Sequence, residues 1–176
     1  MIIRTMYKVK EIFRSIQGEG FHSGKTAVFI RFSGCNLWNG IEKFRKRALC
    51  NFCDTDFVGV DGQNGGEYKL EDLIKKTLEI WGKGKSYHEK FVVLTGGEPL
   101  LQVDTQLIKE LKKKNFYIAV ETNGTINTKL KFDWVVVSPK ENASWNLKNG
   151  DELKVVYPQN KINLKKALDL NFKYFF

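Results

Sequence analysis

Residues 26–38 read TAVFIRFSGCNLW, which is an apolar strand-like run followed by Ser33-Gly34 and then a cysteine. Two more cysteines follow at Cys50 and Cys53, so the spacing is C-x14-C-x2-C. The chain contains 3 cysteines in all, and an odd number cannot be fully paired as disulfides within one chain. Thiolates gathered after a strand are typical of a metal or iron–sulfur site. Three ligands leave one coordination position open.

The spacing alone leaves three interpretations open: an iron–sulfur cluster, a zinc ion, or core thiols without a ligand. A structural zinc site needs a fourth ligand, which His22 or His88 would have to supply, although neither has close ligand spacing. A zinc module also commonly shows paired C-x2-C units, and the chain has one. We therefore favour the cluster and interpret both histidines as surface or structural residues.

The composition is that of one folded domain, with 176 residues and 42% hydrophobic content. The net charge is +9, but many lysines lie on helix-like segments, which indicates solvated faces rather than a nucleic-acid surface. We find no run of 18 apolar residues and no secretory signal, so we expect no membrane partner. Clustered thiols without an export signal indicate a reducing cytoplasm.

Apolar, β-branched runs alternate with helix-period segments along the chain. This alternation predicts an α/β fold with a mainly parallel sheet, and the count fits a partial, open βα barrel. Residues 1–176 are expected to form one domain. Because the chain stops on an apolar strand-like run, we also expect that a C-terminal segment is missing. The predicted strands are 7–13, 26–32, 91–95, 117–121, 134–138, 153–157 and one starting at 174, and helices are predicted around 70–81, 107–111 and 164–170.

Polar and glycine-rich motifs follow the predicted strands, and ligands gather where the carboxyl ends of parallel strands meet loops. We therefore expect these motifs to converge on one rim. The segment 36–67 is a long insertion between a strand and a helix, and connections of this length are usually functional. The motifs are Gly34-Cys35, Gly96-Gly97-Glu98-Pro99, Thr122-Asn123-Gly124 and Pro139-Lys140.

Cysteines after the first core strand and Gly-Gly-Glu-Pro after the second resemble the radical S-adenosylmethionine (SAM) superfamily. Within it, the chain is similar to the 7-carboxy-7-deazaguanine synthase family of the queuosine pathway, from about residue 8 onward. The C-x14-C-x2-C spacing departs from the usual C-x3-C-x2-C and is similar to a subgroup of that family. The motifs occur in order as 15-SIQGEG-20, 29-FIRFSGCNLW-38, 50-CNFCDTDF-57, 95-TGGEP-99, 121-ETNGT-125 and 138-SPK-140.

The resemblance implies a lyase that uses a 4Fe–4S cluster and SAM to convert 6-carboxy-5,6,7,8-tetrahydropterin into 7-carboxy-7-deazaguanine with loss of ammonia. The three cysteines would hold the cluster, and the open iron would bind SAM. Thr55 would be a Mg²⁺ ligand. No protein group is assigned as acid or base. The residues implied to contact SAM are Phe52, Cys53, Asp54, Gly96, Gly97, Glu98, Ser138, Pro139 and Lys140.

On the substrate side, the resemblance implies contacts from Ile16, Gln17, Gly18, Glu19, Arg31 and Thr95. Arg31 lies in an apolar strand, where an unpaired charge is unfavourable, and a substrate carboxylate is a natural partner for its guanidinium. The competing interpretation is a buried ion pair with Glu19 or Glu121. Without the resemblance, Ile16–Glu19 indicates a hairpin turn and Ser138–Lys140 indicates the end of a strand.

The resemblance also implies a flavodoxin-like or ferredoxin-like electron donor and a homodimer. Two alternatives remain: another small radical SAM enzyme, such as a glycyl-radical activase, and a non-enzymatic zinc-binding module. A glycyl-radical activase acts on a protein partner and carries the shorter cysteine spacing, and a zinc-binding module has no catalytic role.

Overall fold

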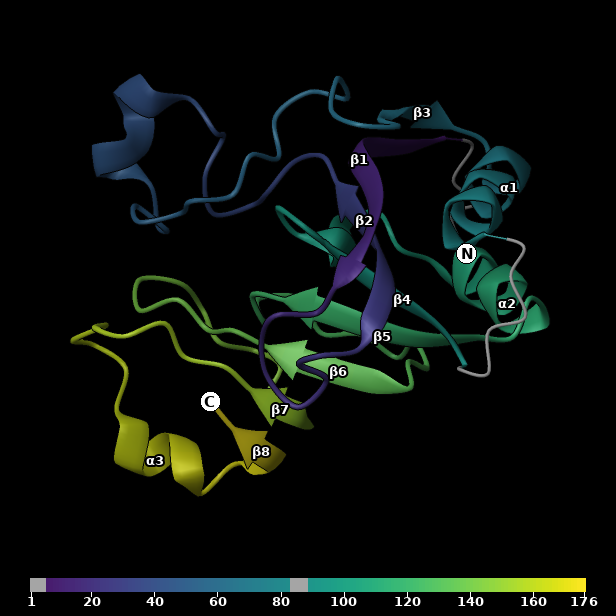
Figure 1. Ribbon diagram of the computed structural model, residues 1–176. Coiled ribbons are helices and arrows are strands. Elements are labelled where there is room, and N and C mark those ends of the chain that lie inside the picture. Colours follow the sequence, from purple (N-terminus) through teal and green to yellow (C-terminus); the bar gives the residue numbers. More distant parts are fainter. Residues whose placement is uncertain (1–5, 83–88) are drawn as a thin grey trace.

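The computed structural model describes residues 6–82 and 89–176, and its centre is one eight-stranded sheet (Figure 1). The strand order is β3-β1-β2-β4-β5-β6-β7-β8. Strand β1 pairs antiparallel with β2 and β3, whereas β2 and β4 to β8 pair parallel with one another. The strands are β1 (Tyr7–Ile16), β2 (Thr26–Phe32), β3 (Gly66–Tyr68), β4 (Lys90–Gly96), β5 (Phe116–Thr122), β6 (Trp134–Val137), β7 (Asn149–Leu153) and β8 (Asn171–Phe175).

The sheet curves but does not close, because β3 and β8 form its two edges. The predicted partial, open βα barrel is therefore confirmed. Three α-helices and two 3₁₀ segments accompany the described strands. They are η1 (Glu42–Arg47), α1 (Leu70–Trp81), η2 (Pro99–Leu101), α2 (Thr105–Lys113) and α3 (Leu164–Leu168).

The main hydrophobic core lies between the outer face of the sheet and helices α1 and α2, which lie side by side in Figure 1. Leu73 and Trp81 from α1 and Leu107 and Leu111 from α2 are buried there. Leu73 and Trp81 are spaced i, i+8 and Leu107 and Leu111 are spaced i, i+4, so each pair lies on one face of its helix. Each helix packs this apolar face on strand side chains that face outward. A smaller cluster of apolar residues fills the inner face.

The predicted strand 153–157 is wrong. Strand β7 lies earlier, at Asn149–Leu153, although its residues are mostly polar. The apolar residues Val156 and Tyr157 are exposed instead. Pairing with β6 and β8 decides this placement, because Asp151 accepts a hydrogen bond from the backbone N of Val135 at 2.9 Å. The short strand β3 was not predicted; it has three residues, begins at a glycine and pairs with β1.

The parallel strands all end at one edge of the barrel, so their following loops meet there. Among the described residues, we find no helix long and apolar enough to span a membrane.

Helix α2 begins at Thr105, and the side chain of the preceding residue, Asp104, caps it. Its Oδ1 accepts hydrogen bonds from the backbone N of Leu107 and from the hydroxyl of Tyr7 on β1, each at 2.9 Å. Removing a capping side chain typically costs about 1–2 kcal/mol. We expect Asp104→Ala to lower the free energy of unfolding by about that amount. Asp104→Asn keeps a capping oxygen and should retain most of the free energy of unfolding, as measured by urea denaturation. If Asp104→Asn and Asp104→Ala lost the same amount, the capping role of Asp104 would be contradicted.

Candidate active site

A cavity of about 540 Å³ opens at the carboxyl ends of the parallel strands, bordered by the insertion and by the hairpin after β1. It brings together nearly all the residues predicted to form the site. Glu98 and Pro139 are not among its lining residues. The predicted residues that line it are Ile16, Gln17, Gly18, Glu19, Arg31, Cys35, Cys50, Phe52, Cys53, Asp54, Thr55, Thr95, Gly96, Gly97, Ser138 and Lys140.

The three cysteines are free thiols on the wall of this cavity. Cys50 is buried, whereas Cys35 and Cys53 are half-buried. A hydrogen bond from Cys50 lowers the pKa of Cys53 to about 6 and raises that of Cys50, and burial raises the pKa of Cys35. In the described part of the chain, no three His, Cys, Asp or Glu side chains gather around a position for one metal ion. Cysteine thiolates are the protein ligands of iron–sulfur clusters.

The Gly96-Gly97 backbone packs tightly on the start of the cysteine loop. Gly96 has φ +128°, and a Cβ there would lie 2.3 Å from the carbonyl oxygen of Phe32. A Cβ on Gly97 would lie 2.2 Å from the carbonyl oxygen of Gly34 and 2.9 Å from the Cβ of Cys35. Only glycine fits at either position. The approach places the Gly96-Gly97 backbone beside Cys35 on the cavity wall, where a carbonyl oxygen can accept a hydrogen bond from the amino group of an amino-acid ligand.

Glu98 stabilises this arrangement from behind the cavity. Its carboxylate is fully buried and accepts hydrogen bonds from the Thr122 hydroxyl and the Asn123 backbone N, both at 2.8 Å, and from Leu100 N at 3.0 Å. Burial raises the pKa of Glu98, and these donors oppose that shift. Since both oxygens are engaged, Glu98 joins the loop after β4 to the end of β5 rather than facing the cavity.

Lys140 contributes the amine on the β6 side of the cavity. Its Nζ donates to the carbonyl oxygen and to Oγ of Ser138, each at 2.7 Å. Burial lowers the pKa of Lys140, whereas the nearby cysteines act in the opposite direction. The Ser-Pro-Lys motif thus ends the strand and also folds its lysine back beside the thiols.

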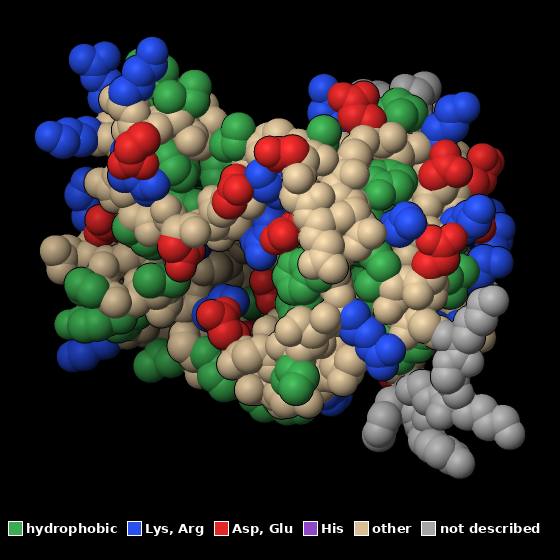
Figure 2. Space-filling model, turned by 45° about the horizontal axis from the view of Figure 1, so that its top comes forward, with side chains coloured by type: hydrophobic (Ala, Val, Ile, Leu, Met, Phe, Trp, Pro, Cys, Tyr) green, Lys and Arg blue, Asp and Glu red, His purple; other side chains and the backbone are tan. Residues whose placement is uncertain are grey.

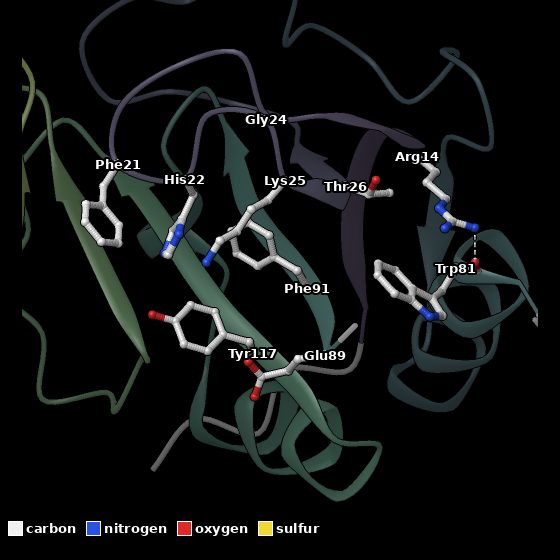
Figure 3. A pocket seen from close by; sticks show the side chains of 10 residues that line it. All are labelled: Arg14, Phe21, His22, Gly24, Lys25, Thr26, Trp81, Glu89, Phe91 and Tyr117. Carbon is white, nitrogen blue, oxygen red and sulfur yellow. Dashed lines mark hydrogen bonds between the residues drawn. The ribbon is translucent and has the colours of Figure 1, made fainter. Parts of the chain in front are cut away.

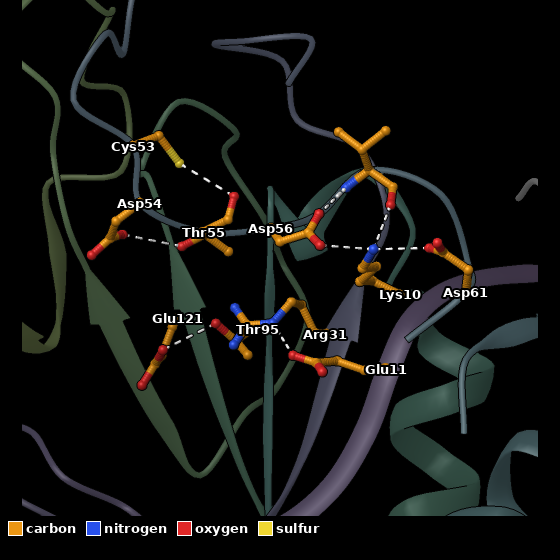
Figure 4. Close-up of polar contacts among 11 residues, drawn as sticks. Lys10, Glu11, Arg31, Cys53, Asp54, Thr55, Asp56, Asp61, Thr95 and Glu121 are labelled. Carbon is orange, nitrogen blue, oxygen red and sulfur yellow. Dashed lines mark hydrogen bonds and ion pairs between the residues drawn. The ribbon is translucent and has the colours of Figure 1, made fainter. Parts of the chain in front are cut away.

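On the opposite wall, Gln17, Thr95 and Glu121 form a polar network. Glu121 accepts from Nε2 of Gln17 and from the Thr95 hydroxyl, both at 3.0 Å, and Figure 4 shows the latter bond. The backbone N of Glu19 donates to the side-chain oxygen of Gln17 at 3.2 Å. Three segments distant in sequence therefore present amide, hydroxyl and carboxylate groups to the cavity.

The partner of Arg31 is Glu11, which lies opposite it in the β1–β2 register, and their Nε and Oε1 atoms are 2.7 Å apart. The alternative pairing with Glu19 or Glu121 is therefore wrong. Glu121 is engaged as described above, and Glu19 pairs with Lys154 at 2.6 Å. In Figure 4 the guanidinium of Arg31 extends from Glu11 toward Thr95.

Sequence reasoning missed Lys154, which follows β7 and lines the cavity. Its ammonium is largely buried; burial lowers its pKa, but the carboxylates of Glu121 and Glu19 outweigh burial and raise it. A lysine directly after a strand was a usable signal, but it was hidden because residues 153–157 were assigned to that strand. Asn123 and Trp38 also line the cavity without having been predicted as site residues.

Lys10 anchors the segment that follows Thr55 (Figure 4). Its Nζ lies 2.9 Å from Asp56 Oδ2, 2.8 Å from Asp61 Oδ1 and 2.9 Å from the carbonyl oxygen of Val58. Thr55 lies one residue before this anchor, and its hydroxyl is 3.5 Å from Asp54 Oδ1. The chain leaving Cys53 is therefore fixed to strand β1.

His22 is buried and does not line this cavity. His88 lies outside the described residues.

Comparison with known proteins assigns this fold and site to a class. The model of the Radical SAM superfamily matches residues 44–143. Among curated proteins, 7-carboxy-7-deazaguanine synthase from Burkholderia multivorans is 49% identical over 170 residues, covering 96% of this chain and 80% of that protein. The protein of the same name from Caulobacter vibrioides is 50% identical over 171 residues, covering 97% and 80%.

The crystal structure of QueE from Escherichia coli is similar to this fold, with a TM-score of 0.67 and 27% identity over 93% of this chain and 76% of that one. The chain belongs to the radical SAM superfamily and, within it, to the 7-carboxy-7-deazaguanine synthase family. It is therefore a radical SAM enzyme, which uses a 4Fe–4S cluster and SAM. Neither the activase nor the zinc-module alternative is favoured.

The ion pairs of Lys10 with Asp56 and Asp61 should stabilise residues 54–61 in a pH-dependent way. Lys10 lowers the pKa of Asp56 and of Asp61. The two ion pairs therefore stabilise the folded state fully at pH values above the unfolded-state pKa of about 3.9. This stabilisation is lost as the pH falls through the lower pKa values of the folded state. We expect Lys10→Met to speed amide hydrogen exchange in residues 54–61 at pH 7. The difference from the wild type should shrink as the pH falls below about 4.

Lys8→Met is the matched control, because among the described residues the ammonium of Lys8, on the same strand, makes an exposed ion pair with Glu67 at 3.3 Å. Exposed ion pairs of this kind contribute little to the free energy of unfolding. Equal exchange in the two variants at pH 7 would contradict the anchoring role of Lys10.

Proposed function

We propose that the chain converts 6-carboxy-5,6,7,8-tetrahydropterin into 7-carboxy-7-deazaguanine with loss of ammonia. The observation that carries this proposal is the arrangement of the cavity, where three thiols on one wall face the Gln17–Glu121–Thr95 network, Arg31 and Lys154 on the other. The relatives' name supports the product, and the carboxylated pterin matches the charge and hydrogen-bonding groups of the cavity.

The residues of the cavity fit the cofactors of the superfamily. Cys35, Cys50 and Cys53 would hold the cluster, and the backbone of Gly97, which lines the same cavity, would bind the methionyl amino group of SAM. Phe52 is partly exposed on the cavity wall, where its ring can pack against adenine. When bound, these cofactors supply the one-electron chemistry that removes a hydrogen atom from the substrate.

The protein's own groups bind and orient the substrate. Arg31 is the cation for the pterin carboxylate: Glu11 engages its Nε and fixes the direction of the side chain. Gln17 and Glu121 offer an amide and a carboxylate to the pterin edge, and they are held in place by each other and by Thr95. Lys154 balances the negative charge of Glu19 and Glu121, so the wall need not repel an anionic substrate.

The assay that tests the proposal uses cluster-loaded protein under anaerobic conditions with reductant, SAM, Mg²⁺ and the carboxylated tetrahydropterin. We expect ammonia and 7-carboxy-7-deazaguanine to form in equal amounts, with SAM required but not consumed. SAM cleavage without any substrate-dependent release of ammonia would contradict the proposed reaction and leave the superfamily assignment intact.

Thr55 is proposed as a Mg²⁺ ligand. Its hydroxyl lies on the cavity wall beside Asp54, and a hard cation that prefers oxygen and keeps several waters suits such a position. We expect Thr55→Ala to lower turnover on the order of tenfold and to abolish stimulation by Mg²⁺, with the absorbance of the cluster unchanged. Thr55→Ser keeps the hydroxyl and should retain the stimulation; loss of the cluster in Thr55→Ala would argue against the proposal.

The electron donor is proposed to dock on η1, the projecting segment within the insertion. Figure 2 shows basic and apolar side chains gathered on this projection. Lys43, Lys46, Arg47 and Phe44 are exposed, and the segment ends just before Cys50. The positive charge favours an acidic partner such as a flavodoxin-like or ferredoxin-like protein.

Reversing the charge of Lys43, Lys46 and Arg47 to Glu tests this docking. Arg45 is left intact because it donates to the carbonyl oxygen of Cys53 at 2.8 Å. We expect the rate with reduced flavodoxin to fall about tenfold or more at low salt and the rate with dithionite to stay the same. A variant with Lys109→Glu and Lys113→Glu on α2 is the control. A parallel loss of the dithionite-driven rate would indicate damage to the site instead.

A further inference from the structure

A second cavity, of about 590 Å³, lies at the opposite end of the barrel, where strands β2, β4 and β5 begin (Figure 3). Thr26, Phe91 and Tyr117 come from the first residues of these strands. The wall is largely aromatic, since Phe21 and Trp81 join Phe91 and Tyr117. Its volume falls within the range of about 300–1,000 Å³ typical of small-molecule sites.

His22 is the unusual residue of this cavity. It is 5% exposed, and its ring contacts Phe21, Phe91 and Tyr117 edge-on at centroid distances of 5.2, 5.0 and 5.4 Å. Within the described chain, both ring nitrogens are buried and lack a hydrogen-bond partner. Burial and the charge of Lys25 lower its pKa, so at neutral pH one nitrogen donates and the other accepts. A buried donor and acceptor left unpaired are unfavourable, which indicates that something else satisfies them.

The position of His22 is enforced by the hairpin that carries it. The backbone N of Gln17 donates to the carbonyl oxygen of Lys25, and that of Gly24 donates to Gln17, both at 2.8 Å. The buried carboxylate of Glu152 accepts from Phe21 N at 3.2 Å and leaves no space for a Cβ at Gly20. The imidazole is thus held in place, and Figure 3 shows it pointing between Lys25 and Tyr117.

Two cations face the same space. The Lys25 side chain is exposed, and Figure 3 shows its ammonium beside the imidazole of His22. Arg14 lies at the other end of the cavity, where its guanidinium is 4.8 Å from the centroid of the Trp81 ring and donates to the carbonyl oxygen of Trp81 at 2.5 Å. Glu89 is the one acidic residue among the described lining residues, so the cavity is net positive.

We propose that this cavity is a second binding site, for a planar heteroaromatic acid. The aromatic wall suits a flat ring. A neutral imidazole has one N–H, and the ring nitrogen of a heterocycle can accept a hydrogen bond from the unpaired N–H of His22. Lys25 and Arg14 suit a carboxylate.

The site is separate from the one that holds the thiols. The hairpin contributes Gln17–Glu19 to the first cavity and Phe21, His22, Gly24 and Lys25 to the second. The two sets of described lining residues do not overlap. The inference does not rest on the proposed function, because binding is measured without SAM or pterin.

The chain has 2 histidines, so the imidazole signals in its NMR spectrum are few and His22 can be followed directly. The experiment titrates cluster-loaded, ¹⁵N-labelled protein without a polyhistidine tag at pH 7.5, using quinoline-2-carboxylate and, separately, quinoline. We expect quinoline-2-carboxylate to shift one histidine saturably, and His22→Phe to remove that set of signals. Quinoline, which lacks the carboxylate, should bind about tenfold more weakly.

Lys25→Met should weaken binding of the acid about tenfold and leave quinoline binding unchanged, because it removes only the charge. Lys109→Met, an exposed lysine on α2, is the matched control and should change neither. The proposal is overturned if His22 does not shift up to about 10 mM acid. It is also overturned if the acid and quinoline bind equally well, or if Lys109→Met weakens binding as much as Lys25→Met.

Discussion

The close approach between the Gly96-Gly97 backbone and the start of the cysteine loop is the constraint on which the site depends. With glycine at both positions, the chain after β4 packs against Gly34 and Cys35 at distances that any Cβ would block. Glu98 N then donates to the carbonyl oxygen of Gly34 at 3.0 Å, and the Glu98 carboxylate holds the end of β5. One thiol, the Gly96-Gly97 backbone and the substrate-side network are thereby set relative to one another.

A buried carboxylate at this point serves geometry rather than direct ligand binding. The Glu98 carboxylate accepts hydrogen bonds from three donors, at the start of η2 and the end of β5. Without it these donors would lack an acceptor. The anchor at Lys10 has the same effect on the other side of the thiols, where Asp56, Val58 and Asp61 converge on one ammonium. The insertion is thus fixed at the end that follows Cys53, and the basic η1 segment projects from its middle (Figure 1).

Much of this could be predicted from the sequence because the signals are local. The strand 26–32 and the helix 70–81 follow from apolar periodicity, and the motifs after strands converge because parallel strands end at one edge. Pairing between strands could not be predicted in the same way, because it depends on residues far apart in the sequence. Glu11 is the partner of Arg31 only because a register shift between Val9 and Glu11 sets the two side chains opposite each other. Likewise, polar β7 is a strand because β6 and β8 flank it.

The central claim is that Cys35, Cys50 and Cys53 would hold the cluster and that the backbone at Gly97, which lines the same cavity, would help to bind SAM. The most direct measurement is the electron paramagnetic resonance spectrum of the reduced, cluster-loaded protein before and after addition of SAM. A 4Fe–4S signal whose g-values change on addition of SAM in the wild type, but not in Gly97→Val, is the predicted result. A signal that SAM leaves unchanged in the wild type, or changes equally in Gly97→Val, would contradict the account.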